Sequence, residues 1–563
     1  MGVGLLLTAL FVGPAQATMG LLGAMAGNAG RDDPFRQRMV TLILVGVATQ
    51  ASILIGLLIA PHAWLVPVVI TVLTTLVVWV WHALAVGAPG PTTTLFACAF
   101  GTYLGARGYS VAEVLPVSLL TWSITAVVSL LLVVVKASAP KHQAVRTARE
   151  SVAAYVDAVQ PGAQGSGTSD ADMSTLRSRA WVMYNDAWAA VRSGLKPGAE
   201  QHSEQGQELQ RQMEALHDQL LAATYADPHS VLGISAAPDG GHRTTEPPTG
   251  LPAMVGLVPL GRPGWKYLLR TSLNPGARAW LIAQRAALAV LIASVSVLLL
   301  HVGHPYWAVL SALIILHMQT GRTELTVRAA HRVVGTGIGV VLYLGFALAH
   351  PGPWLVLGIV VVALYGLELM APTNYAIATV CVTGLALLMS PVTSDAQMES
   401  LIRDRLVETV VGVSAAVLVI WLIGRKAAIR LVRRQYRMTL NCIVDVLIDL
   451  TGQARGNSLR AAEHRRNLIF EVGRASSILA TARTDDPSSL APWSELHEEI
   501  AGLAFDVTAA GWSTAADQAA AQQALQQLRA TIATLPAISS RNIHVEGLAQ
   551  QVAEVHRDFA TSH

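Results

Sequence analysis

Long apolar stretches without a charged side chain constrain the fold of this chain more than any other feature. Asp, Glu, Lys and Arg are absent from residues 1–30, 39–106, 114–135, 286–321, 333–367 and 409–424. Charge-free apolar runs of about 18 residues or more are typical of transmembrane helices. Charged residues make up 13% of the chain, against roughly a quarter of a soluble domain. The sequence therefore predicts a protein that crosses a membrane several times.

Turn residues divide the apolar sequence into twelve expected helices, six before and six after a long polar segment. The helices lie near residues 2–13, 14–29, 39–60, 63–86, 91–107, 112–136, 279–302, 305–320, 332–350, 353–371, 373–392 and 403–424. The turn Gly30–Arg38 parallels the turn Gly321–Arg328, which indicates an internal repeat. Because each group has an even number of spans, both groups enter the membrane in the same direction. We expect an all-α membrane protein with two parallel six-helix repeats.

Apolar and polar segments alternate along the chain. We expect a first transmembrane repeat at residues 1–136, a helical polar region at 137–278, a second transmembrane repeat at 279–425 and a helical C-terminal domain at 426–563. Gly- and Pro-rich stretches at 161–169 and 237–250 are expected to be flexible loops. Residues 440–450 carry an apolar stripe at helical spacing. The two polar regions are therefore predicted to pack together on the cytoplasmic side.

The basic side chains indicate how the chain is oriented. Lys and Arg gather beside helix ends at residues 31–38, 136–149, 262–285, 322–332 and 425–437. Because positively charged turns face the cytoplasm, we expect both termini in the cytoplasm and the protein in a bacterial inner membrane. The residues up to Ala17 resemble a signal peptide, but no Lys or Arg precedes Arg31. A signal peptide needs a basic start, so we expect a short first membrane helix instead.

Several functional classes find no support in the sequence. The net charge of +3 is small for a nucleic-acid-binding protein. Cys98, Cys381 and Cys442 lack the spacing of a disulfide framework or a zinc site. Gly335–Gly339 lies inside an apolar helix, where small residues favour close helix packing over dinucleotide binding. With no nucleotide-binding loop, catalytic triad or metal cluster in the sequence, we expect no enzyme activity and no cofactor.

Side chains at the start of the ninth expected helix are candidates for binding an anion. Arg328, Arg332 and Thr336 are spaced four residues apart and share one helical face. A guanidinium group matches the two oxygens of a carboxylate. The alternative is that both arginines anchor the turn on the positive side of the membrane. Asn374 and Tyr375 are candidates for hydrogen bonds to the same substrate, although helix capping explains Asn374 equally well.

Four further side chains are candidates for proton coupling or gating. Glu368 is the only acidic residue within residues 333–394, and a carboxylate embedded in a membrane is a default candidate for proton transfer. A solvated turn residue is the alternative. His317 is a candidate proton relay or a hydrogen-bond donor to a neighbouring helix. Arg405 and Glu408 stand one helical turn apart and are expected to form an ion pair that breaks during transport, with direct substrate contact as the alternative.

Three short motifs in the second half resemble the fusaric acid resistance (FUSC), or aromatic acid exporter, superfamily. They are Pro305-Tyr-Trp-Ala-Val-Leu, Arg332-x-x-Gly-Thr-x-x-Gly339 and Arg405-x-x-Glu-Thr-x-x-Gly412. The resemblance covers essentially the whole chain. It is strongest over 279–425 and weaker in the first half, where Met19-Gly-Leu-Leu stands in place of the Tyr-Trp segment. Tyr306 and Trp307 are expected in an aromatic belt at the membrane interface, with stacking on an aromatic ligand as the alternative.

The resemblance implies an inner-membrane exporter of organic anions, chiefly aromatic carboxylic acids and related toxic compounds, and hence a drug-resistance role. Because the sequence has no ATP-binding motif, we expect the proton gradient to drive export. Related plant members are anion channels, so a channel or uniporter on the same scaffold is the first alternative. The second is a membrane scaffold whose cytoplasmic helices bind a partner protein in envelope assembly. The resemblance also implies a homodimer and a periplasmic adaptor protein as partners, beside the membrane lipid.

Overall fold

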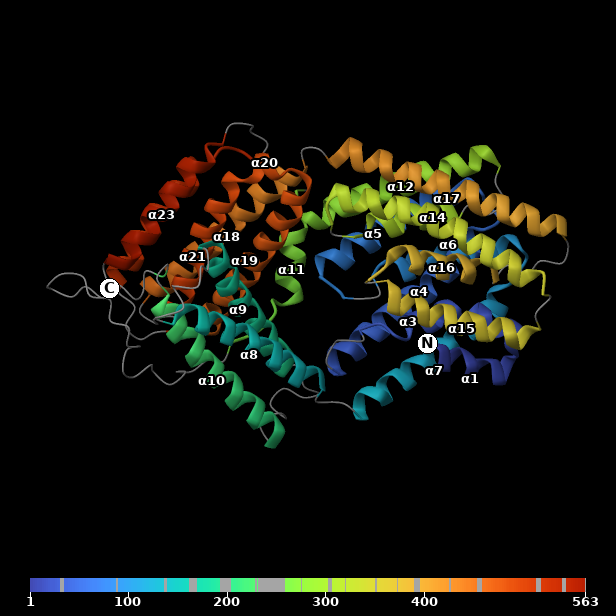
Figure 1. The fold of residues 1–563 in the computed structure, drawn as a ribbon, viewed down its shortest axis with the longest axis horizontal. Coiled ribbons are helices and arrows are strands. Elements are labelled where there is room, and N and C mark those ends of the chain that lie inside the picture. Colours follow the sequence, from blue (N-terminus) through green and yellow to red (C-terminus); the bar gives the residue numbers. More distant parts are fainter. Residues whose placement is uncertain are drawn as a thin grey trace. The chain divides into compact units, whose positions relative to one another are not determined.

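The computed structural model describes most of the chain as helices. The described residues are 1–30, 35–87, 90–135, 139–160, 170–192, 204–227, 230, 259–274, 276–301, 306–318, 320–349, 352–371, 373–388, 395–424, 427–452, 458–512, 518–538 and 543–561. Within these residues all regular secondary structure is helical (Figure 1). The chain forms two compact units, each assembled from two separate segments. We name them the membrane unit (Met1–Lys136 and Leu268–Ala427) and the polar unit (Ala137–Tyr267 and Ala428–His563).

The membrane unit contains two successive groups of helices. The first group is α1 (Gly2–Val12), α2 (Pro14–Ala17), the 3-10 helix η1 (Thr18–Gly20), α3 (Leu21–Ala26), α4 (Phe35–Ile59), α5 (Leu65–Ala83), α6 (Thr92–Ala106) and α7 (Val111–Val135). The second is α12 (Arg278–Leu300), α13 (Tyr306–Leu316), α14 (Arg322–Ala347), α15 (Pro353–Met370), α16 (Tyr375–Leu388) and α17 (Asp395–Gly424). A short helix, α11 (Trp265–Ser272), precedes the second group. Each of the twelve expected ranges thus contains helix.

Seven of the described helices are long and apolar enough to cross a membrane. The seven spans are Arg38–Ile59, Leu65–Ala83, Val111–Leu131, Arg278–Leu300, Arg322–Ala347, Pro353–Met370 and Gln397–Ile423. Three other apolar helices, α1, α13 and α16, are shorter. The expected set of twelve full spans is not reached among the described residues, in part because residues 14–29 break into three short pieces after Gly13, whose φ is +86°. The chain is a multi-pass membrane protein.

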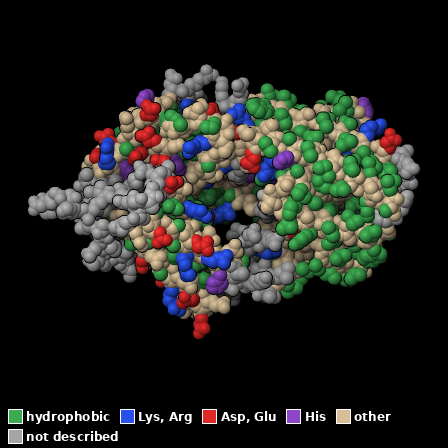
Figure 2. Space-filling view, viewed as in Figure 1, with side chains coloured by type: hydrophobic (Ala, Val, Ile, Leu, Met, Phe, Trp, Pro, Cys, Tyr) green, Lys and Arg blue, Asp and Glu red, His purple; other side chains and the backbone are tan. Residues whose placement is uncertain are grey.

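The surface of the membrane unit is apolar where a soluble protein would be charged. Large hydrophobic side chains such as Phe11, Leu342 and Val362 are more than half exposed. In Figure 2, hydrophobic side chains cover the visible face of this unit, whereas the charged side chains in view lie mostly on the polar unit. A contiguous exposed apolar surface of this extent marks contact with lipid rather than water.

Helix pairs recur between the two groups of the membrane unit. In the first group α4 packs against α6 and α7, and α1 and α3 pack against α7. In the second group α14 packs against α16 and α17, and α12 and α13 pack against α17. Contacts between the groups join α5 to α12, α1 to α15 and α6 to α13. The α14–α16 contact depends on glycine, because a Cβ atom at Gly335 would lie 2.6 Å from the carbonyl oxygen of Ala376.

The polar unit has one continuous hydrophobic core. Its helices are α8 (Ala139–Val159), α9 (Asp170–Val191), α10 (Glu204–Ala226), α18 (Ala427–Thr451), α19 (Leu459–Asp485), α20 (Pro487–Leu490), α21 (Pro492–Ala510), α22 (Gln518–Thr534) and α23 (Val545–Thr561). Leu440, Ile443 and Leu447 of the predicted apolar stripe are fully buried in this core. The core joins side chains from both sequence segments, which confirms that the two polar regions pack together.

Some sequence expectations concern residues that the structure leaves undescribed. Outside the described residues lie four basic residues, Arg31, Lys136, Arg425 and Lys426, and the two expected loops at 161–169 and 237–250.

Candidate anion-binding site

Two arginines are completely buried near the middle of two membrane helices. Arg332 and Arg405 are both 0% exposed. Arg332 lies ten residues after the first residue of the 26-residue helix α14, and Arg405 lies ten residues after the first residue of the 30-residue helix α17. At 1.5 Å per residue, each guanidinium-bearing residue is about 15 Å from the start of its helix. Neither arginine is therefore an anchor at a helix end. For Arg332, the alternative interpretation as an anchor of the turn does not agree with this position.

Arg405 has both a positively and a negatively charged neighbour. Arg332 and Glu408 both lie close enough to Arg405 for their charges to interact with its guanidinium. Glu408, one turn after Arg405 on α17, is also 0% exposed. Two guanidinium groups and one carboxylate leave one net positive charge within this group of three. Because a charge buried away from water costs several kcal/mol unless it is paired, the arrangement favours occupation by an additional anion.

Hydroxyl groups of two threonines connect the buried arginines to neighbouring helices. Arg405 Nη2 donates a hydrogen bond to Thr383 Oγ1 at 3.4 Å, and Thr383 Oγ1 donates to Thr336 Oγ1 at 3.5 Å. Thr336 lies on α14, four residues after Arg332, and Thr383 lies on α16. Both threonines are fully buried. The site is therefore assembled from α14, α16 and α17.

Several N–H groups of the two guanidiniums point to no acceptor. Among the described residues, Arg332 Nε and Nη2 and Arg405 Nε and Nη1 are buried without a hydrogen-bond partner. The hydroxyl group of Tyr375 and the ring nitrogen of Trp307 are buried in the same condition. Native proteins rarely leave buried donors unsatisfied. A carboxylate or phosphate group would satisfy two N–H donors of one guanidinium at once.

Aromatic rings border the site on the side of α13. The guanidinium carbon of Arg405 lies 4.0 Å from the ring centroid of Trp307. Tyr306 follows at 4.5 Å between ring centroids, and Tyr103 of α6 lies 4.8 Å from Tyr306. Tyr306 and Trp307 are 2% and 1% exposed. The expected aromatic belt at the membrane interface is therefore wrong for these two residues, because α13 begins inside the protein core and its first residues pack against α6 and α17.

The remaining predicted substrate residues lie outside the buried pair. Arg328 forms an ion pair with Glu324 at 3.2 Å, and its guanidinium carbon lies 5.3 Å from the ring centroid of Tyr375. Tyr375 connects this pair to the site, because its hydroxyl group also interacts electrostatically with Arg405. Asn374 is exposed, and its Oδ1 accepts hydrogen bonds from the backbone N–H groups of Ala376 and Ile377. Asn374 therefore acts as a helix cap, which was the alternative explanation.

Two of the predicted coupling residues also lie away from the buried arginines. Asn28 Nδ2 donates to Glu368 Oε1 at 2.6 Å, which ties α15 to the segment after α3. His317 follows α13 and is partly buried, and its Nδ1 lies 3.1 Å from the carbonyl oxygen of Leu313 in that helix. By contrast Arg405 and Glu408 belong to the site itself. Thr383 is the site residue that sequence reasoning missed, since a single threonine in an apolar helix carries no signal of its partners.

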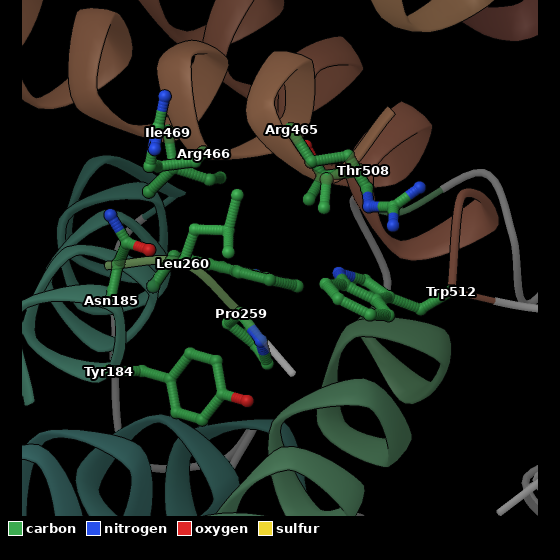
Figure 3. Close-up of a pocket in the computed structure, with 11 residues that line it drawn as sticks. Tyr184, Asn185, Pro259, Leu260, Arg465, Arg466, Ile469, Thr508 and Trp512 are labelled. Carbon is green, nitrogen blue, oxygen red and sulfur yellow. The ribbon is translucent and has the colours of Figure 1, made fainter. Parts of the chain in front are cut away.

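The polar unit contains a small cavity that does not compete as a site for an organic ligand. Its volume is about 20 Å³, enough for a single water molecule. In Figure 3, Leu260 lies between Asn185 on one side and Trp512 on the other. The guanidinium carbon of Arg465 stacks 4.1 Å from the Trp512 ring, and Arg465 Nη1 donates to the carbonyl oxygen of Gly511 at 3.1 Å. The side chains here pack a core rather than enclose a ligand.

The fold and the buried site define the chain as an all-helical, multi-pass membrane protein. Residues 288–419 match the family model described as "Fusaric acid resistance protein-like". This segment, which runs from within α12 to within α17 and includes Arg332, Thr336, Thr383 and Arg405, therefore belongs to the FUSC family. No curated protein and no solved structure matches the chain. The match confirms the resemblance inferred from the three motifs.

Proposed function

We propose that this protein exports organic anions, with aromatic carboxylic acids as the substrate class, by binding their carboxylate between Arg332 and Arg405. The observation that carries the proposal is the buried pair of guanidiniums, which have unsatisfied N–H donors among the described residues. Family membership supports a role in membrane transport. The proposed location is the bacterial inner membrane, with both termini in the cytoplasm, because Lys and Arg gather at one set of turns.

The aromatic part of the substrate class follows from the neighbours of the guanidiniums. Trp307 and Tyr306 place two large ring surfaces beside Arg405. A flat ring attached to a carboxylate can pack against these surfaces while its oxygens face the N–H donors. Thr336 and Thr383 add hydroxyl groups that hold the acceptor in one orientation. An inorganic anion would use the guanidiniums but not the rings, so the arrangement favours an aromatic acid over a small anion.

The burial of the site supports a carrier over an open channel. Arg332, Arg405, Thr336 and Thr383 are each 0% exposed, so no continuous water path reaches them in this structure. A carrier must enclose its substrate before exposing it to the other side. The recurring helix pairs of the two groups support the proposal that twelve segments form two related halves. Adjacent helices of such halves move relative to each other during alternating access.

In this proposal, Glu408 is the side chain that couples anion transport to protons. Glu408 is buried next to Arg405, whereas Glu368 accepts a hydrogen bond from Asn28 elsewhere. Protonation of Glu408 would raise the positive charge of the site and strengthen anion binding, and release of the proton would weaken it. The test is benzoate efflux from loaded proteoliposomes with and without a pH gradient. Efflux that does not change when the gradient collapses contradicts proton coupling but leaves anion transport intact.

The binding proposal is tested by radiolabelled benzoate exchange in proteoliposomes. Arg332→Gln and Arg405→Gln should each lower exchange about 10- to 100-fold, because each removes charge-assisted hydrogen bonds worth about 1.5–3 kcal/mol. Arg403→Gln is the matched control, since the Arg403 side chain on the same helix is 74% exposed. Excess unlabelled benzoate should compete better than excess acetate. Exchange at control level in both buried-arginine variants would overturn the proposal.

A further inference from the structure

Three aromatic rings in succession, with a guanidinium at each end, form a series of contacts in the membrane unit. From Arg405 the series passes through Trp307, Tyr306 and Tyr103, with 4.0, 4.5 and 4.8 Å between successive groups. It ends at Arg107, whose guanidinium carbon lies 5.1 Å from the Tyr103 ring centroid. Tyr103, Tyr306 and Trp307 are buried, whereas Arg107 is exposed. The series thus connects the buried site to the surface of the unit.

A second, shorter series leaves the site in another direction. Tyr375 interacts electrostatically with Arg405, and the guanidinium carbon of Arg328 lies 5.3 Å from the Tyr375 ring centroid. The Arg328 side chain is 20% exposed, and its partner Glu324 is 51% exposed. Such a half-exposed pair is weak, at about 0–1 kcal/mol. Arg328 is therefore able to exchange Glu324 for another anion at little cost.

The two series leave the buried pair in opposite directions along α13. A Cβ atom at Gly90, before α6, would lie 3.6 Å from the ring of His317, after α13. Tyr103, near the end of α6, contacts Tyr306 at the start of α13, so α6 and α13 run antiparallel. Arg107 follows the end of α6 and lies where α13 begins. Arg328 lies six residues, about 9 Å, after the first residue of α14, which starts where α13 ends, so Arg328 lies on the side of the buried pair that faces the end of α13.

We propose that these two series form the route of the anion, with Arg107 and Arg328 as its two mouths. This inference rests on the proposed function, because the anion binds to the Arg332–Arg405 pair between the two ends of the route. An anion is drawn to an exposed guanidinium at either mouth by its charge. It then passes tyrosine and tryptophan rings, whose edges carry partial positive charge, and reaches the buried pair. The rings close the route when no anion is passing, which accounts for the complete burial of Arg405.

The two mouths make a prediction that depends on the side from which the substrate enters. Benzoate uptake is measured in right-side-out and inside-out membrane vesicles containing the full chain. Arg107→Gln should raise the half-saturating benzoate concentration about tenfold in one orientation only, and Arg328→Gln should do so only in the other. The change should appear in the half-saturating concentration, because both residues act where the anion enters and lie outside the buried pair. Added salt should shrink both effects, since exposed charges are screened.

Matched variants separate a mouth from a general surface charge. Arg403→Gln removes an exposed arginine two residues before Arg405 on α17, at the level where α13 begins and Arg107 also lies. Arg403→Gln should leave the half-saturating benzoate concentration unchanged in both vesicle orientations. Arg107→Lys and Arg328→Lys should keep a half-saturating concentration close to that of the unchanged protein. If both Gln variants behave like Arg403→Gln in both orientations, or if both act from the same side, the route is wrong. In that case the proposed function still stands as long as Arg405→Gln abolishes uptake.

Discussion

The guanidinium group of Arg405 on α17 lies over the indole ring of Trp307 on α13, with 4.0 Å from the guanidinium carbon to the ring centroid. The contact is fully desolvated, since both residues are almost completely buried. It holds the guanidinium in place while leaving its Nε and Nη1 donors without partners among the described residues. An attractive ring face therefore fixes the cation without consuming the hydrogen bonds that a substrate would need.

Removal of the Trp307 ring should impair transport without removing any charge. Trp307→Leu eliminates a cation–π contact worth about 2 kcal/mol when desolvated, so benzoate exchange should fall roughly tenfold or more. Trp307→Phe retains a ring and should keep most of the activity. The measurement is the exchange rate in proteoliposomes with equal protein content. Equal rates for Trp307→Leu and the unchanged protein would show that the ring does not position Arg405.

Two glycines on α14 should respond very differently to an added methyl group. A Cβ atom at Gly339 would lie 2.7 Å from the Cβ atom of Thr383, whereas no atom lies within 4 Å of the corresponding position at Gly337. Gly339→Ala should push α16 away and misplace the Thr383 hydroxyl that binds Arg405, which lowers both the thermal unfolding temperature and transport. Gly337→Ala should be neutral or stabilise the helix by about 0.5–1 kcal/mol. Equal melting temperatures for the two variants would contradict the close packing.

Acid should destabilise the polar unit through His497, which is partly buried. Burial lowers the pKa of His497 to about 4, below the value of about 6.5 for an unfolded chain. The unfolded state therefore binds more protons between these pH values, and stability falls as the pH drops through this window. The loss at pH 5 amounts to about 2 kcal/mol. His497→Phe should lose less thermal stability between pH 7 and pH 5, as followed by tryptophan fluorescence.

A second histidine of the polar unit has the opposite effect, because its protonation stabilises the folded state. A hydrogen bond from His464 Nδ1 to Asp449 Oδ2 at 2.7 Å raises the pKa of His464 and outweighs burial, which lowers it. Its contribution to stability is present below the unfolded pKa of about 6.5 and is lost as the pH rises through the higher folded value. His464→Gln should therefore reduce stability at pH 6 more than at pH 9. An equal reduction at both pH values would mean that the proton is not involved.

A buried ion pair should matter far more to the polar unit than an exposed one. Arg177 Nη1 lies 3.4 Å from Asp227 Oδ2, with side chains 4% and 0% exposed, and Tyr155 OH donates to the same oxygen at 2.7 Å. Arg177→Met leaves Asp227 without this cation and should destabilise the unit by about 3–5 kcal/mol. Arg146→Met is the matched control, because the Arg146–Glu150 pair is 70% exposed on both sides. The control should cost less than about 1 kcal/mol. Similar melting temperatures for both variants would contradict this difference.

The helices were predictable from the sequence because lipid imposes a local rule. A segment inside a membrane must be apolar and must satisfy its own backbone hydrogen bonds, so charge-free runs such as residues 333–347 coincide with helices such as α14. The number of full spans was less predictable. The lengths of α13 and α16 depend on where each helix begins within the packed core, and hydropathy carries no information about that starting point.

The candidate site was predictable only where its residues share a helix. Arg332 and Thr336 lie four residues apart, so helical periodicity alone places them on one face. Thr383 and Trp307 reach Arg405 from other helices, and their approach depends on packing between distant segments. Trp307 was misplaced for the same reason: beside Pro305 it has the sequence context of an interfacial residue, yet the surrounding helices bury it. Tertiary contacts, rather than local propensity, decide the chemistry of this site.

The interleaving of the two units has a consequence for the order of events during synthesis. Trp181 of α9 stacks on Phe505 of α21, with 6.0 Å between ring centroids. The whole second group of membrane helices is translated between these two residues. The first part of the polar unit therefore emerges from the ribosome without the surface that buries its aromatic side chains. Until α18–α23 are made, α8–α10 expose a hydrophobic face, and this interval is when the chain is most vulnerable to aggregation and most dependent on chaperones.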